Sequence, residues 1–297
     1  MYCDRAMLSI QKILVPIVFT DTSRHVVHQA AWLARRFHAE IILLHIVTPF
    51  NYPVGILESG HEATARDLHA HIVQRAEEAL EQALRPELEG IANTRLVLKG
   101  HPVEGIVNAA RDQGADLIVM STFGDGTFYP YVLGSVTAKV LQDSPCPIWT
   151  GAHLEDPPAH EFSIRNVLCS VDLTEHSRHT LSVAAEMAAA VDATLKLVHI
   201  TTSVESWGPG GSYVDQKWKQ EIVGIAAKEI AQVQEDAGTN AEVIIDSGNV
   251  PQLLNRAAEK TNADLLVVGH RPGRGHLGDN GNGYGIITQS QIPILSV

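Results

Sequence analysis

Residues 12–48 read KILVPIVFTDTSRHVVHQAAWLARRFHAEIILLHIVT, and this stretch decides the fold. It begins with Lys12–Phe19, a run of apolar and β-branched residues that is typical of a strand buried on both faces. Asp21–Ser23 then offers an N-cap to a helix whose apolar residues recur at helical spacing. A second buried strand, Glu40–Val47, follows. The stretch therefore predicts a β-α-β unit with parallel strands.

The same pattern returns 154 residues later, where residues 166–202 read NVLCSVDLTEHSRHTLSVAAEMAAAVDATLKLVHITT. Further matches follow in the same order, with Ala-Asp-Leu at 115–117 and 263–265 and Pro-Ile at 147–148 and 293–294. Ordered matches along a chain of 297 residues indicate a tandem duplication. The segment between the copies is polar and contains prolines, as a linker should. We expect domain 1 over 9–151, a linker over 152–163 and domain 2 over 164–297.

Each copy alternates strands with helices throughout. In copy one, further strands are predicted at Arg95–Lys99, Asp116–Ser121 and Cys146–Thr150, separated by helical patterns. This order predicts two doubly wound α/β domains, each with a five-stranded parallel sheet and helices on both faces. In such a fold, ligands bind at the carboxyl ends of the strands, where the strand order reverses.

The composition excludes several functions. A formal net charge of −12 disfavours binding to nucleic acid, because a polyanion is repelled. No apolar run is long enough to span a bilayer, and the N-terminus lacks the pattern of a signal peptide. The three cysteines are far apart, which favours reduced thiols. We expect a cytoplasmic protein without nucleic-acid or membrane partners.

One loop of copy one carries residues suited to an anion. Ser121 ends a predicted strand, Gly124 follows three residues later, and Gly134-Ser135 precedes a predicted helix. Such a loop can direct backbone N–H groups and a hydroxyl at an anion, next to the positive end of a helix. The alternative is an ordinary connection with Ser135 as a simple N-cap. The spacing alone does not decide between them.

The order of elements, His45-Ile46 at the end of strand two, Gly134-Ser135 and the segment 144–148 resemble the universal stress protein family. The resemblance covers nearly the whole chain, once per copy. It implies the adenine-nucleotide α-hydrolase-like fold for each domain. It also implies a pseudo-dimer within the chain, paired through the last strands at 147–150 and 293–297, with a further homodimer left open.

ATP-binding members of that family carry G-x2-G-x9-G-(S/T) in this loop, an aspartate after strand one and a hydrophobic residue after the strand-two histidine. In domain 1 the resemblance implies a nucleotide site that departs from the family at two positions, because a serine replaces the first glycine and a valine replaces the aspartate. The site residues are Val18, Ile46, Ser121, Gly124, Gly134 and Ser135.

Domain 2 departs from the family in the opposite way. It keeps the aspartate and the first glycine, but Pro272 stands where the second glycine belongs and cannot donate an N–H. The resemblance therefore implies a weaker site, with Asp172, Ile200 and Gly269. Arg271 is a further candidate of this site that could supply charge to a phosphate; the alternative is a solvated loop arginine.

For function, the resemblance implies a stress-response protein that binds or senses an adenine nucleotide, ATP with Mg²⁺, and acts through conformation or partners. One alternative is a structural or interaction protein whose pockets have decayed, and another is a slow ATP hydrolase. We expect no catalytic residues, because nothing supplies both a positioned base and a phosphate-clamping lysine. We also expect no metal site in the protein itself, since side chains at positions such as His69 and His71 diverge on a helix.

Overall fold

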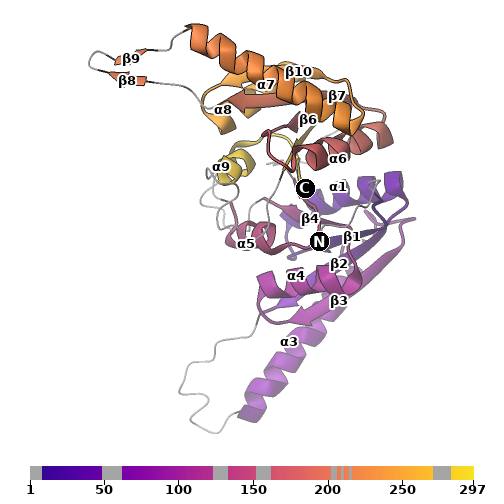
Figure 1. Cartoon of the computed structure of the whole chain (residues 1–297). Coiled ribbons are helices and arrows are strands. Elements are labelled where there is room, and N and C mark those ends of the chain that lie inside the picture. The colour runs from indigo at the N-terminus through magenta and orange to yellow at the C-terminus, as the bar shows by residue number, and fades with distance from the viewer. Residues whose placement is uncertain are drawn as a thin grey trace. The chain divides into compact units, whose positions relative to one another are not determined.

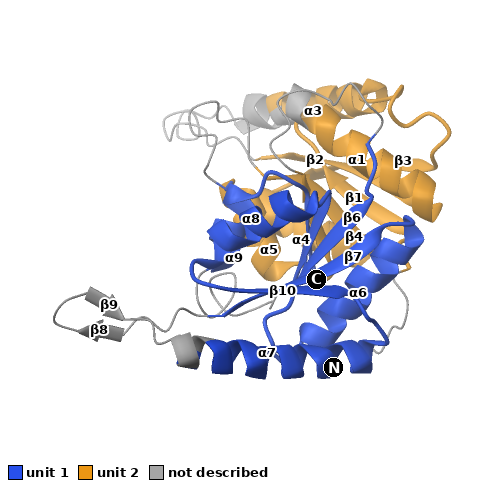
Figure 2. Cartoon of the chain, turned by 90° about the horizontal axis from the view of Figure 1, so that it is seen from above, with its two compact units in different colours: residues 1–8, 129–133, 159–297 blue, residues 9–128, 134–158 orange. Residues whose placement is uncertain are grey.

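The computed structural model describes residues 9–48, 62–122, 133–151, 162–201, 206–208, 211–213, 216–269 and 282–297, and Figure 1 shows their elements along the chain. The chain divides into two compact units, one made mostly of residues 9–158 and the other mostly of residues 159–297 (Figure 2). These units are called domain 1 and domain 2 below.

Domain 1 contains the expected five-stranded parallel sheet, with strand order β5-β4-β1-β2-β3. The strand order reverses between β1 and β4, so the carboxyl ends of these two strands flank the position at which ligands bind in this class of fold. Its elements are β1 (Lys12–Pro16), α1 (Asp21–Phe37), β2 (Glu40–Val47), α3 (Glu62–Gln82), β3 (Asn93–Lys99), α4 (Pro102–Gln113), β4 (Leu117–Ser121), α5 (Ser135–Asp143) and β5 (Ile148–Gly151).

Domain 2 repeats this topology, with strand order β10-β7-β6-β11-β12 and parallel pairing throughout. Helix α6 packs on α7, and α8 packs on α9, with the two pairs on opposite faces of the sheet (Figure 2). Its elements are β6 (Asn166–Ser170), α6 (Ser177–Ala190), β7 (Thr194–Thr201), α7 (Gln216–Ala237), β10 (Glu242–Ser247), α8 (Val250–Thr261), β11 (Leu265–Val268), α9 (Asn282–Gln289) and β12 (Ile294–Ser296). A two-stranded antiparallel hairpin, β8 (Ser206–Gly208) with β9 (Gly211–Tyr213), lies between β7 and α7 and was not expected.

The first strand and first helix of domain 1 differ from the sequence prediction at the turn that joins them. Strand β1 ends at Pro16 rather than Phe19, and α1 begins at Asp21, so its N-cap is Thr20. The Ser23 hydroxyl does not cap the helix. It accepts a hydrogen bond from Val18 N at 3.1 Å and donates one to Val18 O. This pair of bonds fixes the backbone where the chain leaves the sheet.

At the opposite edge of each sheet, the repeated Ala-Asp-Leu sequence has a structural role. Oδ2 of Asp116 accepts hydrogen bonds from the backbone N of Gln11 and Lys12, at 2.9 and 3.0 Å. In domain 2, Oδ2 of Asp264 accepts the equivalent bonds from Arg165 and Asn166, at 2.8 and 2.9 Å. Each aspartate thereby ties the start of the first strand to the start of the fourth.

The helices in the described part of the chain are all too short or too polar to cross a membrane.

Candidate functional site

The register of β1 against β2 brings together two of the residues predicted for the domain 1 site. Pro16 is paired with Leu44, and Ile17 N donates a hydrogen bond to Leu44 O at 2.8 Å. Continuing this register places Val18 level with Ile46. Val18 lies two residues beyond the end of β1 and Ile46 is next to the last residue of β2, so both are at the carboxyl edge of the sheet.

The register of β1 against β4 adds a third predicted residue. Leu14 is paired with Ile118, and continuing this register places Ile17 level with Ser121. Val18 and Ser121 therefore lie on either side of the point where the strand order reverses.

Helix α5 begins next to the end of β4. Thr137 Oγ1 donates a hydrogen bond to Ser121 O at 3.0 Å, and Gly134 N donates one to Thr122 O at 3.1 Å. Gly134 is the N-cap of α5, and Ser135, its first residue, is exposed. The first N–H groups of a helix have no partner inside the helix, and the helix dipole is positive at this end. An anion is therefore favoured beside Ser121.

Two predicted residues, Gly124 and Arg271, lie outside the described part of the chain. The other five residues of the domain 1 prediction, from Val18 to Ser135, lie at or just beyond the carboxyl ends of β1, β2 and β4 or at the start of α5.

Gly105, which the sequence analysis did not single out, makes room for the Ile46 side chain. Gly105 lies in α4, and a Cβ atom built on it would be 2.5 Å from Ile46 Cδ1. Helix α4 therefore approaches β2 closely because position 105 has no side chain. A glycine within the first turn of a helical pattern, here at its fourth position, is the sequence signal that points to such a contact.

The edge of domain 1 is apolar and aromatic beside Val18. Val18 and Phe19 are each 46% exposed, although both are large hydrophobic residues. The Phe19 ring lies 4.4 Å from the His45 ring between centroids, at an interplanar angle of 38°. His45 Nδ1 lies 3.0 Å from Ile17 O, which orients the imidazole.

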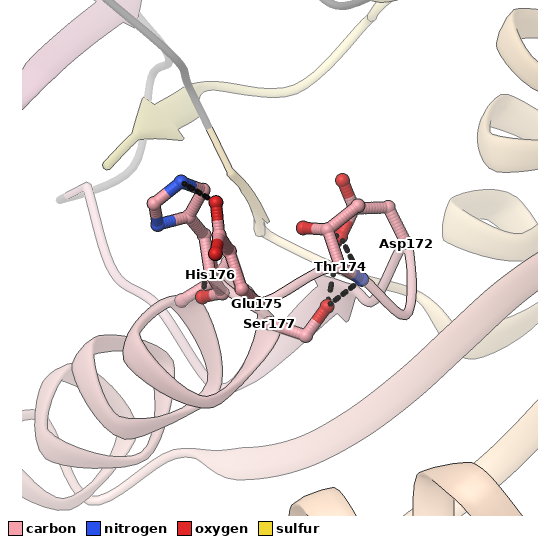
Figure 3. A network of polar contacts seen from close by, with 6 residues as sticks. Asp172, Thr174, Glu175, His176 and Ser177 are labelled. Carbon is pink, nitrogen blue, oxygen red and sulfur yellow. Dashed lines mark hydrogen bonds and ion pairs between the residues drawn. The ribbon is translucent and has the colours of Figure 1, made fainter.

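The matching turn of domain 2 is built around a carboxylate, as Figure 3 shows. Oδ1 of Asp172 accepts hydrogen bonds from Thr174 N at 3.1 Å, from Thr174 Oγ1 at 2.8 Å and from Ser177 Oγ at 2.7 Å. The Ser177 hydroxyl also accepts a bond from Thr174 N at 3.0 Å. Asp172 therefore orders the turn that leads into α6.

The strand registers place the described predicted residues of domain 2 at the equivalent edge. Ser170 is paired with both Val198 and Val268, which puts Asp172 level with Ile200. A Cβ atom on Gly269 would be 2.9 Å from Thr180 Oγ1, so the glycine allows β11 to end close to α6. His199 Nδ1 lies 2.7 Å from Val171 O, which repeats the arrangement of His45 in domain 1.

The described residues contain no group of three or more His, Cys, Asp or Glu side chains that could hold a metal ion. Cysteine chemistry is also disfavoured near the domain 2 site. Burial, followed by the nearby charge of Asp172, raises the pKa of Cys169 to about 12, so its thiol is protonated at neutral pH.

Comparison with known proteins agrees with this architecture. The model of the universal stress protein family matches residues 9–150 and 163–294. A universal stress protein of Methanothermobacter thermautotrophicus is 31% identical over 145 residues, which are 46% of this chain and 92% of that protein. A universal stress protein structure from Archaeoglobus fulgidus covers 97% of both chains with a TM-score of 0.62 and 20% identity. A universal stress protein solved in complex with cAMP is 26% identical over a match that covers 47% of this chain and 94% of that chain, with a TM-score of 0.30.

The fold is a pair of doubly wound α/β domains. The chain belongs to the universal stress protein family, as a member with two tandem copies of the family domain.

Proposed function

We propose that domain 1 binds an adenine nucleotide, ATP with Mg²⁺, at the carboxyl edge of β1, β2 and β4. The protein then acts in the stress response through a change of conformation or through partners. The observation that supports this proposal is the convergence of Ile46, Ser121 and the N-terminus of α5 at one strand-order reversal.

The division of roles follows from the chemistry of each part. The N-terminus of α5, with the backbone of Gly134 and the hydroxyl of Ser135, receives the phosphates. The backbone and side chain of Ile46 contact the base. We do not propose hydrolysis as the function, because the site edge offers no phosphate-clamping lysine and no positioned base among its described residues.

The proposal is tested by denaturing freshly purified protein and identifying the released small molecules by mass spectrometry. We expect an adenine nucleotide from the native chain and much less from Gly134→Val, because a side chain at the N-cap of α5 would keep phosphate oxygens away from the backbone amides. Gly105→Ala should also reduce the yield, because its new methyl group displaces Ile46. The control is Asp172→Ala, which alters only domain 2.

A native chain that releases no nucleotide and binds no added MgATP at millimolar concentration would contradict the proposal. It would favour the alternative of an interaction protein with decayed pockets.

A further inference from the structure

The two domains present opposite chemistry at the same position of the fold. Where domain 2 has Asp172, an exposed carboxylate, domain 1 has Val18, which is 46% exposed. The next residue is Phe19 in domain 1, also 46% exposed, and Leu173 in domain 2. Domain 1 therefore exposes two consecutive apolar side chains to water at the edge where its ligand is proposed to bind.

The backbone that carries this apolar surface is held in place. Both backbone polar groups of Val18 are bonded to the Ser23 hydroxyl, so the turn is fixed without help from the Val18 side chain. The Phe19 ring packs against His45, and His45 is oriented by Ile17 O. The apolar surface is thus preorganised, which lowers the entropic cost of covering it with a ligand.

The backbone conformation differs between the domains at this step. Leu173 has a positive φ of 58°, a left-handed conformation that is unfavourable for leucine, and the turn around Asp172 holds it there. Among the described residues of domain 1, Phe19 is not among those with positive φ. The chain therefore leaves β1 along a different path from β6, and Val18 does not reproduce the geometry of Asp172.

We propose that the domain 1 site, although it accepts ATP, binds an adenine nucleotide with an apolar or aromatic group at its sugar more tightly than one with free sugar hydroxyls. This inference rests on the proposed nucleotide site. Sugar hydroxyls laid against Val18 and Phe19 would lose water without gaining a hydrogen bond from those side chains, which is unfavourable. An apolar or aromatic group in the same place covers exposed hydrophobic surface and can stack on the Phe19 ring.

Three probes separate these possibilities by calorimetry or fluorescence titration with Mg²⁺. They are ATP, 2′,3′-dideoxy-ATP, which lacks both sugar hydroxyls, and N-methylanthraniloyl-ATP, which carries an aromatic ester on the sugar. For the native chain we expect the dideoxy compound to bind at least as tightly as ATP. The aromatic ester should bind about tenfold more tightly, the range expected of one aromatic contact.

The variants test which residues are responsible. Phe19→Ala, and Phe19→Leu as a version that keeps apolar volume, should remove the advantage of the aromatic ester. Val18→Asp should make ATP bind more tightly than the dideoxy compound. Gly134→Val should abolish the signal of all three probes, which assigns the signal to domain 1.

The failures are distinguishable. If the native chain binds ATP about tenfold more tightly than the dideoxy compound, or if Phe19→Ala keeps the advantage of the aromatic ester, the selectivity is wrong while the nucleotide site stands. If no probe binds, the proposed function and the selectivity both fail.

Discussion

Ser177 donates a hydrogen bond from its hydroxyl to Oδ1 of Asp172 at 2.7 Å. The equivalent serine of domain 1, Ser23, instead bonds the backbone of Val18 on both sides of the residue. The carboxylate of domain 2 therefore has a structural use as well as a potential ligand contact. In domain 1 the backbone of Val18 binds the serine hydroxyl instead, so the turn does not require a carboxylate and position 18 can carry an apolar side chain.

Asp172→Ala should lower the free energy of unfolding of domain 2 by about 1–2 kcal/mol, because it removes the acceptor of three hydrogen bonds at the start of α6. Urea denaturation followed by circular dichroism measures the change. The matched control is Val18→Ala, which should change stability by less than about 0.5 kcal/mol because that side chain is exposed and makes no polar contact of its own. Equal effects of the two substitutions would show that Asp172 does not stabilise the turn.

Asp116→Ala should destabilise domain 1 by about 2 kcal/mol, since two backbone N–H groups at the start of β1 lose a charged acceptor. Asp264→Ala should have a similar effect on domain 2. The control is Asp112→Ala on the exposed face of α4, with an expected change below about 0.5 kcal/mol. The structural role would be wrong if Asp116→Ala unfolded at the same urea concentration as the control.

Buried polar contacts also differ between the copies. Trp149 Nε1 donates a hydrogen bond to Gln29 Oε1 at 2.6 Å within domain 1. The corresponding residues of domain 2 are Val183 and Leu295, so both partners of the pair are apolar there.

Gln29→Val should cost about 1–3 kcal/mol, because the buried indole N–H loses this acceptor. In a double-mutant cycle with Trp149→Leu, the coupling between the two positions should be about 1 kcal/mol or more. Thermal or urea unfolding of the four proteins gives this value. Strictly additive effects would mean that the hydrogen bond contributes nothing measurable to stability.

The two thiols within the described residues, Cys146 and Cys169, should be unreactive at neutral pH. Burial raises the pKa of Cys146 to about 11 and that of Cys169 to about 12. Peptide mapping after iodoacetamide treatment at pH 8 should find Cys146 labelled roughly a hundredfold more slowly than an ordinary thiol, and Cys169 labelled only after unfolding. Because the folded pKa values exceed the unfolded one, the thiols also make stability fall as pH rises above about 9. Rapid labelling of Cys169 in the folded protein would contradict its burial.

The sequence predicted the architecture because that information is periodic and local. The β-branched run from Lys12 and the repeat of residues 12–48 at 166–202 sufficed for two parallel sheets. The sequence predicted that the first strand ends at Phe19, but β1 ends three residues earlier, at Pro16. The error arose because residues 17–19 continue the apolar pattern of the strand. Apolar composition alone does not reveal where hydrogen bonding to neighbouring strands stops.

The site was predictable only where a motif marks it. The register of β1 against β2 runs to Pro16 and Leu44 and points toward Val18 and Ile46, but the tilted contact of the Phe19 and His45 rings depends on side chains from different strands. The sequence also did not predict that the Ser23 hydroxyl bonds the backbone of Val18, whereas the equivalent serine of domain 2 bonds a carboxylate. This difference depends on the hydrogen bonds of a single hydroxyl. The hairpin β8–β9 went unpredicted, although Pro-Gly-Gly at 209–211 is a turn signal.

The central claim is that domain 1, rather than domain 2, holds the better phosphate site. A hydrogen bond from the first turn of α5 to a charged phosphate would contribute about 1.5–3 kcal/mol, so two or three of them would outweigh one missing contact at Val18. Titration calorimetry with MgATP on the native chain, Gly134→Val and Asp172→Ala measures this most directly. We predict one strong site per chain that Gly134→Val abolishes and Asp172→Ala leaves within about threefold of its native affinity. Binding that is lost in Asp172→Ala and unchanged in Gly134→Val would contradict the account.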